Sequence, residues 1–211
     1  MRTLVRAQTR ITHSDPKAEF GALTVALAAY VAATRESDIT PQEFLALIRQ
    51  HVDDTEFNTL LRKVADSLER GESAGAFAAS IGCANGVSGY MYHTLPCVLH
   101  VWLAHQRDYR AAVTAMIRLG GDSDTTAAIV GAIVGARVGK TGIPGEWITN
   151  LAEWPRTVPW MKSLAQRLSQ CCREQRCGQR VWINPALLLM RNVVFMLIVM
   201  AHGFRRLLPP Y

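Results

Sequence analysis

The stretch Gly120-Gly121-Asp122-Ser123-Asp124-Thr125-Thr126-Ala127-Ala128-Ile129 places two carboxylates and hydroxyl side chains at the start of an apolar segment. The two glycines let the backbone turn tightly, and residues 127–138 have the composition of a buried helix. Carboxylate and hydroxyl oxygens are hard ligands that suit Mg²⁺, Mn²⁺ or Ca²⁺. An aspartate at a helix start is also a common cap for free backbone N–H groups. These residues alone favour the helix cap over a metal site, and only their wider sequence context favours the metal site.

Glycines recur within the helix that follows. Gly131, Gly135 and Gly139 lie about one helical turn apart. Each costs roughly 1 kcal/mol relative to alanine inside a helix, so their presence on one face needs a packing reason. We expect another helix to approach this face closely, as happens where small residues line a helix crossing. The helix is therefore predicted to be central to the domain.

Helical periodicity continues outward on the N-terminal side. A helix is expected after Pro16, with Phe20, Leu23, Leu27 and Val31 on one stripe, and others after Pro41, after Asp54, over residues 95–104 and over residues 109–119. Residues 82–89 are rich in glycine and predict a loop beside a helix N-terminus, a setting that suits anion binding. No strand alternation is visible. The sequence therefore predicts an all-α fold.

Three motifs occur in the order in which one enzyme family carries them. They are RITHSDP at 10–16, SGY followed by HTLP at 88–96, and GGDSDTTAAIVGAIVGARVGKTGIPGEW at 120–147. Together they resemble the ADP-ribosylglycohydrolase family, which includes the dinitrogenase-reductase-activating glycohydrolases. The last motif is similar to the C-terminal signature of that family.

The resemblance implies a compact, orthogonal, all-helical bundle with a two-metal site that holds Mg²⁺ or Mn²⁺. By resemblance, Asp122, Asp124 and Thr125 are metal ligands. His13 and Tyr90 would line the ADP-ribose pocket, and Gly89 would allow the substrate to approach closely. The reaction implied is hydrolysis of the bond between ADP-ribose and its acceptor, through an oxocarbenium-like transition state. The partner is then ADP-ribose or an ADP-ribosylated substrate.

His13 and Tyr90 also have simpler interpretations. A histidine beside Ser14 and Asp15 commonly belongs to a turn that precedes a helix. A tyrosine such as Tyr90 can pack in the core with its hydroxyl hydrogen-bonded. The resemblance favours the pocket for both residues.

The resemblance also implies ligands that this chain does not contain. Family members carry a Gly-Asp-Ala-Leu-Gly-like segment and a Thr-Asp-Asp-Thr segment before the motif that contains His13. The sequence thus predicts an N-terminally truncated family fold with half of the metal site, because two carboxylates and a hydroxyl are too few for two six-coordinate ions. Asp53-Asp54-Thr55 is not expected to replace them, since it follows His13 and since Asp54 or Thr55 reads as a helix cap.

Composition narrows the class of partner. Lys and Arg number 23 and Asp and Glu 17, which gives a formal net charge of +6. This suits a polyanionic ligand such as ADP-ribose, whereas basic and aromatic residues are not interleaved as in nucleic-acid-binding proteins, so no nucleic-acid partner is expected. The five cysteines, including Cys171, Cys172 and Cys177, have no metal-binding spacing. Together with the absence of a signal peptide at Met1, they predict a cytoplasmic location.

The C-terminal region differs from the rest. Residues 185–201, PALLLMRNVVFMLIVMA, are strongly apolar, with Arg180 before them and Arg205 and Arg206 after. Three interpretations are open: a helix at a membrane interface, a helix that docks on the domain or a second copy through residues 185–206, and a membrane span, which needs about 20 apolar residues. We therefore expect a family-like domain over 1–178 and an apolar C-terminal helix over 179–211.

Three functions follow from the sequence. The first is metal-dependent ADP-ribosylglycohydrolase activity. The second is binding of ADP-ribose, or a purely structural role, by a catalytically incomplete relative. The third is a membrane-associated or structural helical protein whose tail dominates its behaviour.

Overall fold

The computed structural model describes residues 1–176 and 178–207, so Cys177 and the last four residues of the predicted C-terminal region lie outside the described residues. Within them the chain forms helices and no strand, which confirms the predicted all-α fold. The helices are α1 (Arg2–Thr9), α2 (Pro16–Thr34), α3 (Pro41–Arg49), α4 (Thr55–Glu69), α5 (Ala74–Ser80), α6 (Met91–Ala104), α7 (Tyr109–Leu119), α8 (Ser123–Val138), the 3₁₀ turn η1 (Lys140–Gly142), α9 (Gly145–Thr149), α10 (Val158–Glu174) and α11 (Pro185–Arg206).

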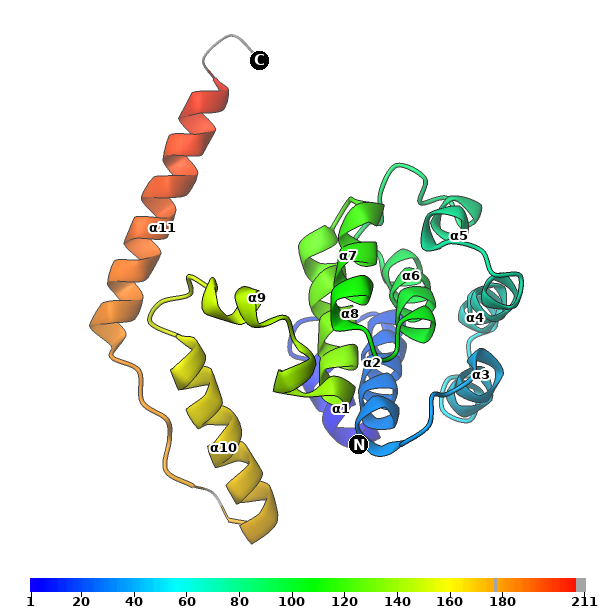
Figure 1. The fold of residues 1–211 in the computed structure, drawn as a ribbon, viewed down its shortest axis with the longest axis horizontal. Helices are drawn as coiled ribbons and strands as arrows, with labels where there is room; N and C mark the ends of the chain where they lie inside the picture. The colour runs from blue at the N-terminus through cyan, green and yellow to red at the C-terminus, as the bar shows by residue number, and fades with distance from the viewer. Residues whose placement is uncertain (177, 208–211) are drawn as a thin grey trace. The chain divides into compact units, whose positions relative to one another are not determined.

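The chain divides into two compact units, Met1–Pro144 and Gly145–Tyr211. In the first unit α8 packs against α2, α6 and α7 (Figure 1). On the other side of α6 lie α4 and α5, and α3 packs against α4. The predicted central position of the glycine-containing helix is confirmed.

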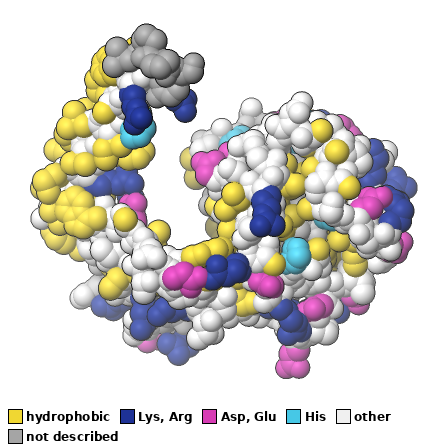
Figure 2. Space-filling view, turned by 45° about the horizontal axis from the view of Figure 1, so that its top comes forward, with side chains coloured by type: hydrophobic (Ala, Val, Ile, Leu, Met, Phe, Trp, Pro, Cys, Tyr) yellow, Lys and Arg dark blue, Asp and Glu magenta, His cyan; other side chains and the backbone are white. Residues whose placement is uncertain are grey.

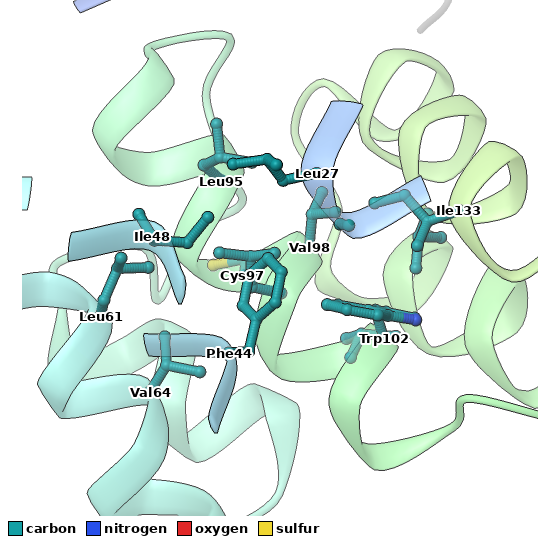
Figure 3. Packing of buried hydrophobic residues seen from close by; sticks show 14 of the residues in the cluster. Leu27, Phe44, Ile48, Leu61, Val64, Leu95, Cys97, Val98, Trp102 and Ile133 are labelled. Carbon is teal, nitrogen blue, oxygen red and sulfur yellow. The ribbon is translucent and has the colours of Figure 1, made fainter. Parts of the chain in front are cut away.

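Large apolar side chains of α3, α4, α6 and α8 meet in the core of this unit (Figure 3). The rings of Phe44 and Trp102 meet edge to face, with centroids 4.9 Å apart, and both side chains are almost fully buried. Phe57 stacks on Tyr92 at 5.5 Å. Aromatic pairs with such geometry add about 0.5–1.5 kcal/mol to the burial of their area.

The glycines of α8 have two different roles. A Cβ atom on Gly131 would lie 3.0 Å from the Oη of Tyr109, and one on Gly135 would lie 3.5 Å from the same ring, so α7 does approach this face closely. Gly139 has open space around it but a φ of +63° as the C-cap of α8. This positive φ ends the helix, and glycine suits the position because residues with a Cβ rarely adopt that backbone conformation.

Most helix starts in the first unit carry a side-chain cap. Asp15, Thr40, Asp54, Ser73 and Asp108 each accept a hydrogen bond from the first turn of the helix that follows. For α4, Asp54 Oδ1 accepts from the backbone N–H of Phe57 at 2.7 Å. The interpretation of Asp54 as a cap is therefore confirmed. Such caps contribute about 1 kcal/mol each.

The second unit contains α9, α10 and α11. By length and composition α11 is long and apolar enough to cross a membrane, and none of its side chains is buried. The predicted boundary at residue 178 falls between α10 and α11, inside this unit. That boundary stays a prediction.

A buried histidine makes the stability of the first unit depend on pH. His100 is 1% exposed, its ring stacks on Phe77, and its Nε2 lies 3.2 Å from Ser67 Oγ. Burial lowers the pKa of His100 from 6.5 to about 4, although the charge of Glu72 acts in the opposite direction. As the pH falls from 6.5 towards 4, the unfolded chain gains a proton that the folded chain does not, so stability falls.

We expect the free energy of unfolding to decrease by about 3 kcal/mol between pH 7 and pH 4 on account of His100. Urea denaturation followed by circular dichroism at several pH values measures this. In His100→Gln the free energy of unfolding should depend less steeply on pH and should be lower overall. An equal dependence on pH in the variant and the wild type would contradict the attribution to His100.

Candidate functional site

Two loops that are distant in sequence are joined at the start of α8. Val87 and Gly121 form an isolated parallel bridge, in which Val87 N–H donates to Gly120 O at 3.1 Å and Asp122 N–H donates to Val87 O at 2.7 Å. Val87 is fully buried. The bridge therefore anchors the loop before α6 to the loop before α8.

Only glycine fits at the centre of this junction. Gly121 has a φ of +76°, and a Cβ there would lie 2.2 Å from the backbone oxygen of Val87. Gly86 has a φ of +118°, and its Cβ would lie 2.7 Å from the backbone nitrogen of Gly121. Since the obstructing atoms are backbone, they cannot rotate away. The close approach of the two loops depends on these glycines.

Asp122 stands at the N-cap position of α8 but does not cap it. Its ψ of 57° differs from the extended values at the capped helix starts, and its carboxylate accepts no hydrogen bond from the first turn. Asp124 lies in that turn and is exposed. Among residues 1–176 and 178–207, neither carboxylate has a hydrogen bond or ion pair with another side chain. The cap interpretation is therefore wrong for Asp122.

The carboxylate of Asp122 lies against Gly89. A Cβ on Gly89 would be 2.9 Å from Asp122 Oδ2, so the absence of a side chain at 89 leaves room for this oxygen. The local structure is fixed by Ser88, whose backbone oxygen accepts from Thr94 Oγ1 at 2.8 Å and whose Oγ lies 2.9 Å from His93 Nδ1. His93 thus supports the conformation of this loop.

A groove of about 550 Å³ opens beside this junction, within the range of small-molecule sites. It is lined from α1 and the following turn by Val5, Gln8, Thr9, Thr12 and His13; from α2 by Ala18, Gly21, Ala22, Val25, Ala26 and Ala29; and from the two loops, α6 and α8 by Gly89, Met91, Thr94, Leu95, Thr125 and Ile129. Three of the predicted site residues, His13, Gly89 and Thr125, therefore line one groove.

His13 reaches the groove from the turn between α1 and α2. Its backbone N–H donates to Thr9 O at 2.9 Å, and its Nδ1 lies 2.8 Å from Thr12 Oγ1. These contacts orient the ring on an exposed turn. His13 is thus available to a ligand in the groove, and its role there stays a prediction.

Tyr90 is next to the groove but does not line it. Its hydroxyl accepts a hydrogen bond from Lys17 Nζ at 3.0 Å, and Lys17 also pairs with Glu56 at 3.1 Å. Hydrogen bonds with Tyr90 and Glu56 raise the pKa of Lys17 above its ordinary value. The Tyr90 ring is 45% exposed and meets His93 edge to face at 5.2 Å. Its contact with ADP-ribose stays a prediction.

The α2 wall of the groove was not predicted from the sequence. The apolar stripe that was predicted for this helix contains Leu23 and Leu27 and faces the core. On the other side Ala18, Ala22, Ala26 and Ala29 recur at spacings of three and four, and they form a shallow face of small side chains. That spacing is visible in the sequence and could have identified the wall.

The metal ligands inferred from the resemblance have suitable chemistry but are too few. Asp122, Asp124 and Thr125 offer hard oxygen atoms at one helix start, and the two carboxylates are not engaged elsewhere. Within the described residues, no three His, Cys, Asp or Glu side chains cluster to hold a metal ion. The residues present therefore fit part of the coordination shell of Mg²⁺ or Mn²⁺.

Gly89→Ala tests whether the position of the Asp122 carboxylate matters. Gly89 is not among the glycines with positive φ, so its backbone admits alanine. The new methyl group should displace Asp122 Oδ2 by a few tenths of an ångström. We expect stability to change by less than about 1 kcal/mol and Mn²⁺ affinity to fall roughly tenfold.

Calorimetric titration with Mn²⁺ in the presence of ADP-ribose provides the measurement for Gly89→Ala. Gly75→Ala in α5 is the matched control, since only Ser73 Oγ lies as near as 4.0 Å to its Cβ. Unchanged affinity in Gly89→Ala would show that the contact with Asp122 is incidental.

Comparison with known proteins finds relatives of this chain by sequence. The chain is 27% identical over 148 residues to the ADP-ribosyl-[dinitrogen reductase] glycohydrolase of Rhodospirillum rubrum, covering 70% of this chain and 42% of that protein. It is 22% identical over 198 residues to the ADP-ribosylhydrolase ARH3 of Gallus gallus, covering 81% and 53%. It is 34% identical over 82 residues to the ADP-ribosylarginine hydrolase Tri1 of Pseudomonas putida (strain GB-1), covering 38% and 20%.

The chain thus spans about half or less of the length of these relatives. No solved structure matches it. The family model for ADP-ribosylglycohydrolase matches residues 1–177, which include both loops, the groove and α8. This protein belongs to the ADP-ribosylglycohydrolase family.

Proposed function

We propose that this chain binds ADP-ribose in the groove beside α8 and takes part in metal-dependent hydrolysis of the bond between ADP-ribose and an acceptor. One observation carries the proposal: the Asp122 carboxylate leaves the helix start uncapped and lies against Gly89, beside a groove lined by His13 and Thr125. A carboxylate with only a structural role would be expected to cap the helix, as Asp54 does.

Each residue has a role in the proposed site. Asp122, Asp124 and Thr125 would hold Mg²⁺ or Mn²⁺. When bound, the metal supplies a fixed position for water and stabilisation of developing charge. His13 would hydrogen-bond the ligand from the opposite wall, and the apolar face of α2 would exclude water from one side of it. Gly89 would leave room for the ribose beside the Asp122 carboxylate.

The site needs further metal ligands. We propose that acidic residues outside those described here complete it, because two carboxylates and a hydroxyl do not fill two six-coordinate shells. The lengths of the relatives support this proposal, since a large part of each relative lies beyond its match to this chain. For the acceptor, we propose only that it is a side chain to which ADP-ribose is attached.

A second function is binding of ADP-ribose without turnover. The incomplete set of acidic ligands favours it, because no cluster of three potential ligands forms in the described part of the chain. The groove, at about 550 Å³, is large enough for a nucleotide-sized ligand.

One experiment separates the two functions. The full chain is incubated with arginine- and serine-ADP-ribosylated peptides, with Mn²⁺ or with a chelator, and released ADP-ribose is measured; ADP-ribose binding is measured by calorimetry on the same sample. Release that requires Mn²⁺ supports hydrolysis. Binding without release supports the second function, and the absence of both from a folded sample overturns both.

A further inference from the structure

Charge is divided unevenly between the two units. Residues 1–144 contain 14 Lys or Arg and 14 Asp or Glu. Residues 145–211 contain nine Lys or Arg but only three Asp or Glu. The whole formal net charge of +6 therefore falls in the second unit. A basic surface of this kind attracts anionic partners through their combined field.

The apolar character of α11 extends around the helix. Residues 193–200 are eight consecutive apolar side chains, each 42–57% exposed, and Figure 2 shows hydrophobic side chains along this helix. Eight residues make more than two turns, so this stretch has no polar face. A protein surface that docks on one side would leave the other side in water. A lipid phase would cover all sides, as it does for helices that are hydrophobic all round.

The length and ends of α11 also suit a bilayer. Its 22 residues span about 33 Å, close to the thickness of the hydrocarbon core, which is about 30 Å. Arg205 and Arg206 lie at its C-terminal end. Inside the helix, Arg191 pairs with Glu153 at 3.2 Å and packs over the ring of Phe195. Its charge is therefore compensated, and its long side chain can extend towards the headgroups.

A pocket of about 690 Å³ lies beside the start of α11, within the second unit. Arg156, Arg167 and Arg180 line it together with Trp160 and Trp182, and leucines of α10 and α11 complete the wall. None of the three arginines forms an ion pair within residues 1–176 and 178–207. Arginine binds phosphate well, and tryptophan is enriched at membrane interfaces, so this combination matches a phospholipid headgroup next to acyl chains.

We propose that the second unit binds a bilayer that contains anionic phospholipid, with α11 in the hydrocarbon region and the arginine-lined pocket at the headgroups. The proposal does not depend on the function of the groove in the first unit. Insertion removes the apolar surface of α11 from water, and the basic side chains select the anionic surface.

Flotation tests the proposal. The full chain is made by cell-free synthesis with phosphatidylcholine vesicles, with or without phosphatidylglycerol, and separated on a density gradient at low and at high salt. We expect the protein to float with the anionic vesicles, at least about tenfold more strongly than with neutral ones at low salt. It should remain bound at high salt, because insertion is apolar. Release by free phosphate at equal ionic strength would overturn a headgroup site.

Two double variants separate the contributions. Val193→Asp/Leu197→Asp places carboxylates in the lipid and should weaken binding by about 100-fold or more. Arg205→Gln/Arg206→Gln should weaken binding to anionic vesicles roughly 30-fold and leave neutral vesicles unaffected. Leu4→Asp/Ile117→Asp is the control, since these side chains of the first unit are 73% and 53% exposed. Circular dichroism checks that all three remain helical.

Two outcomes would overturn the proposal. One is equal flotation of Val193→Asp/Leu197→Asp and the wild type. The other is a wild-type chain that stays in solution as a defined oligomer in the presence of anionic vesicles, which would show that α11 is covered by a second copy.

Discussion

Gly121→Ala is expected to destabilise the first unit by more than about 3 kcal/mol and to abolish the candidate site. Alanine at a φ of +76° costs about 1 kcal/mol. Its Cβ would lie 2.2 Å from Val87 O, so the hydrogen bonds of the loop bridge would have to break, at about 1 kcal/mol each. Because Asp122 donates to Val87 through its own backbone, its carboxylate would move away from Gly89. Urea denaturation and titration with Mn²⁺ measure the two effects.

Gly120→Ala separates backbone strain from the close approach of the loops. Gly120 has a similar φ of +71° with a ψ of −167°, a backbone region almost exclusive to glycine, but open space where a Cβ would lie, so we expect a loss of about 1–3 kcal/mol from backbone strain alone. If the two variants lost the same stability, the bridge between Val87 and Gly121 would contribute little, and the description of the junction would be wrong.

Asp122→Asn/Asp124→Asn should reduce Mn²⁺ affinity by about 100-fold or more, measured by calorimetry with ADP-ribose present. The amides keep the size of the side chains but lose the charge that Mn²⁺ requires. Within the described residues, neither carboxylate forms a side-chain hydrogen bond or ion pair that stabilises the fold, so the free energy of unfolding should change by less than about 0.5 kcal/mol. A loss of binding with retained stability would show that this pair of carboxylates supplies metal ligands.

Asp53→Asn is the matched control for this pair. Asp53 is an exposed carboxylate in the segment that looks like a family metal motif but precedes a capped helix. Its substitution should leave Mn²⁺ affinity unchanged. If Asp53→Asn weakened binding as much as the double variant does, the ion would be held elsewhere, and the proposed role of Asp122 and Asp124 would fail.

Local patterns were enough to predict the fold class and several helices. Pro16, Pro41 and Asp54 mark helix starts that the structure confirms. The start of α6 was placed near Leu95, but the helix begins at Met91 and contains Pro96. The difference arises because the loop around Ser88 supports the first turn through Thr94, which is a contact outside helical periodicity. α10 was not predicted, although Met161, Leu164, Leu168 and Cys171 recur at helical spacing in the sequence.

The candidate site depended on contacts that are distant in sequence. The bridge between Val87 and Gly121 joins loops more than thirty residues apart, and no local pattern in either loop specifies it. An aspartate before a helix predicts a cap, and only this bridge explains why Asp122 has a different backbone conformation. The resemblance to the family identified the candidate site residues. The contacts and backbone conformations around these residues could be learned only from the structure.

The uncapped start of α8 has a consequence for protein engineering. A side-chain cap at a helix start commonly contributes about 1 kcal/mol, so a search for stabilising substitutions would treat the uncapped start of α8 as a defect. If the proposed metal site is correct, the Asp122 carboxylate lies against Gly89 at the expense of the stability that a cap would add. Thermostabilised versions of this protein should therefore keep Asp122 unchanged, and gains in melting temperature should be sought at helix starts away from the groove.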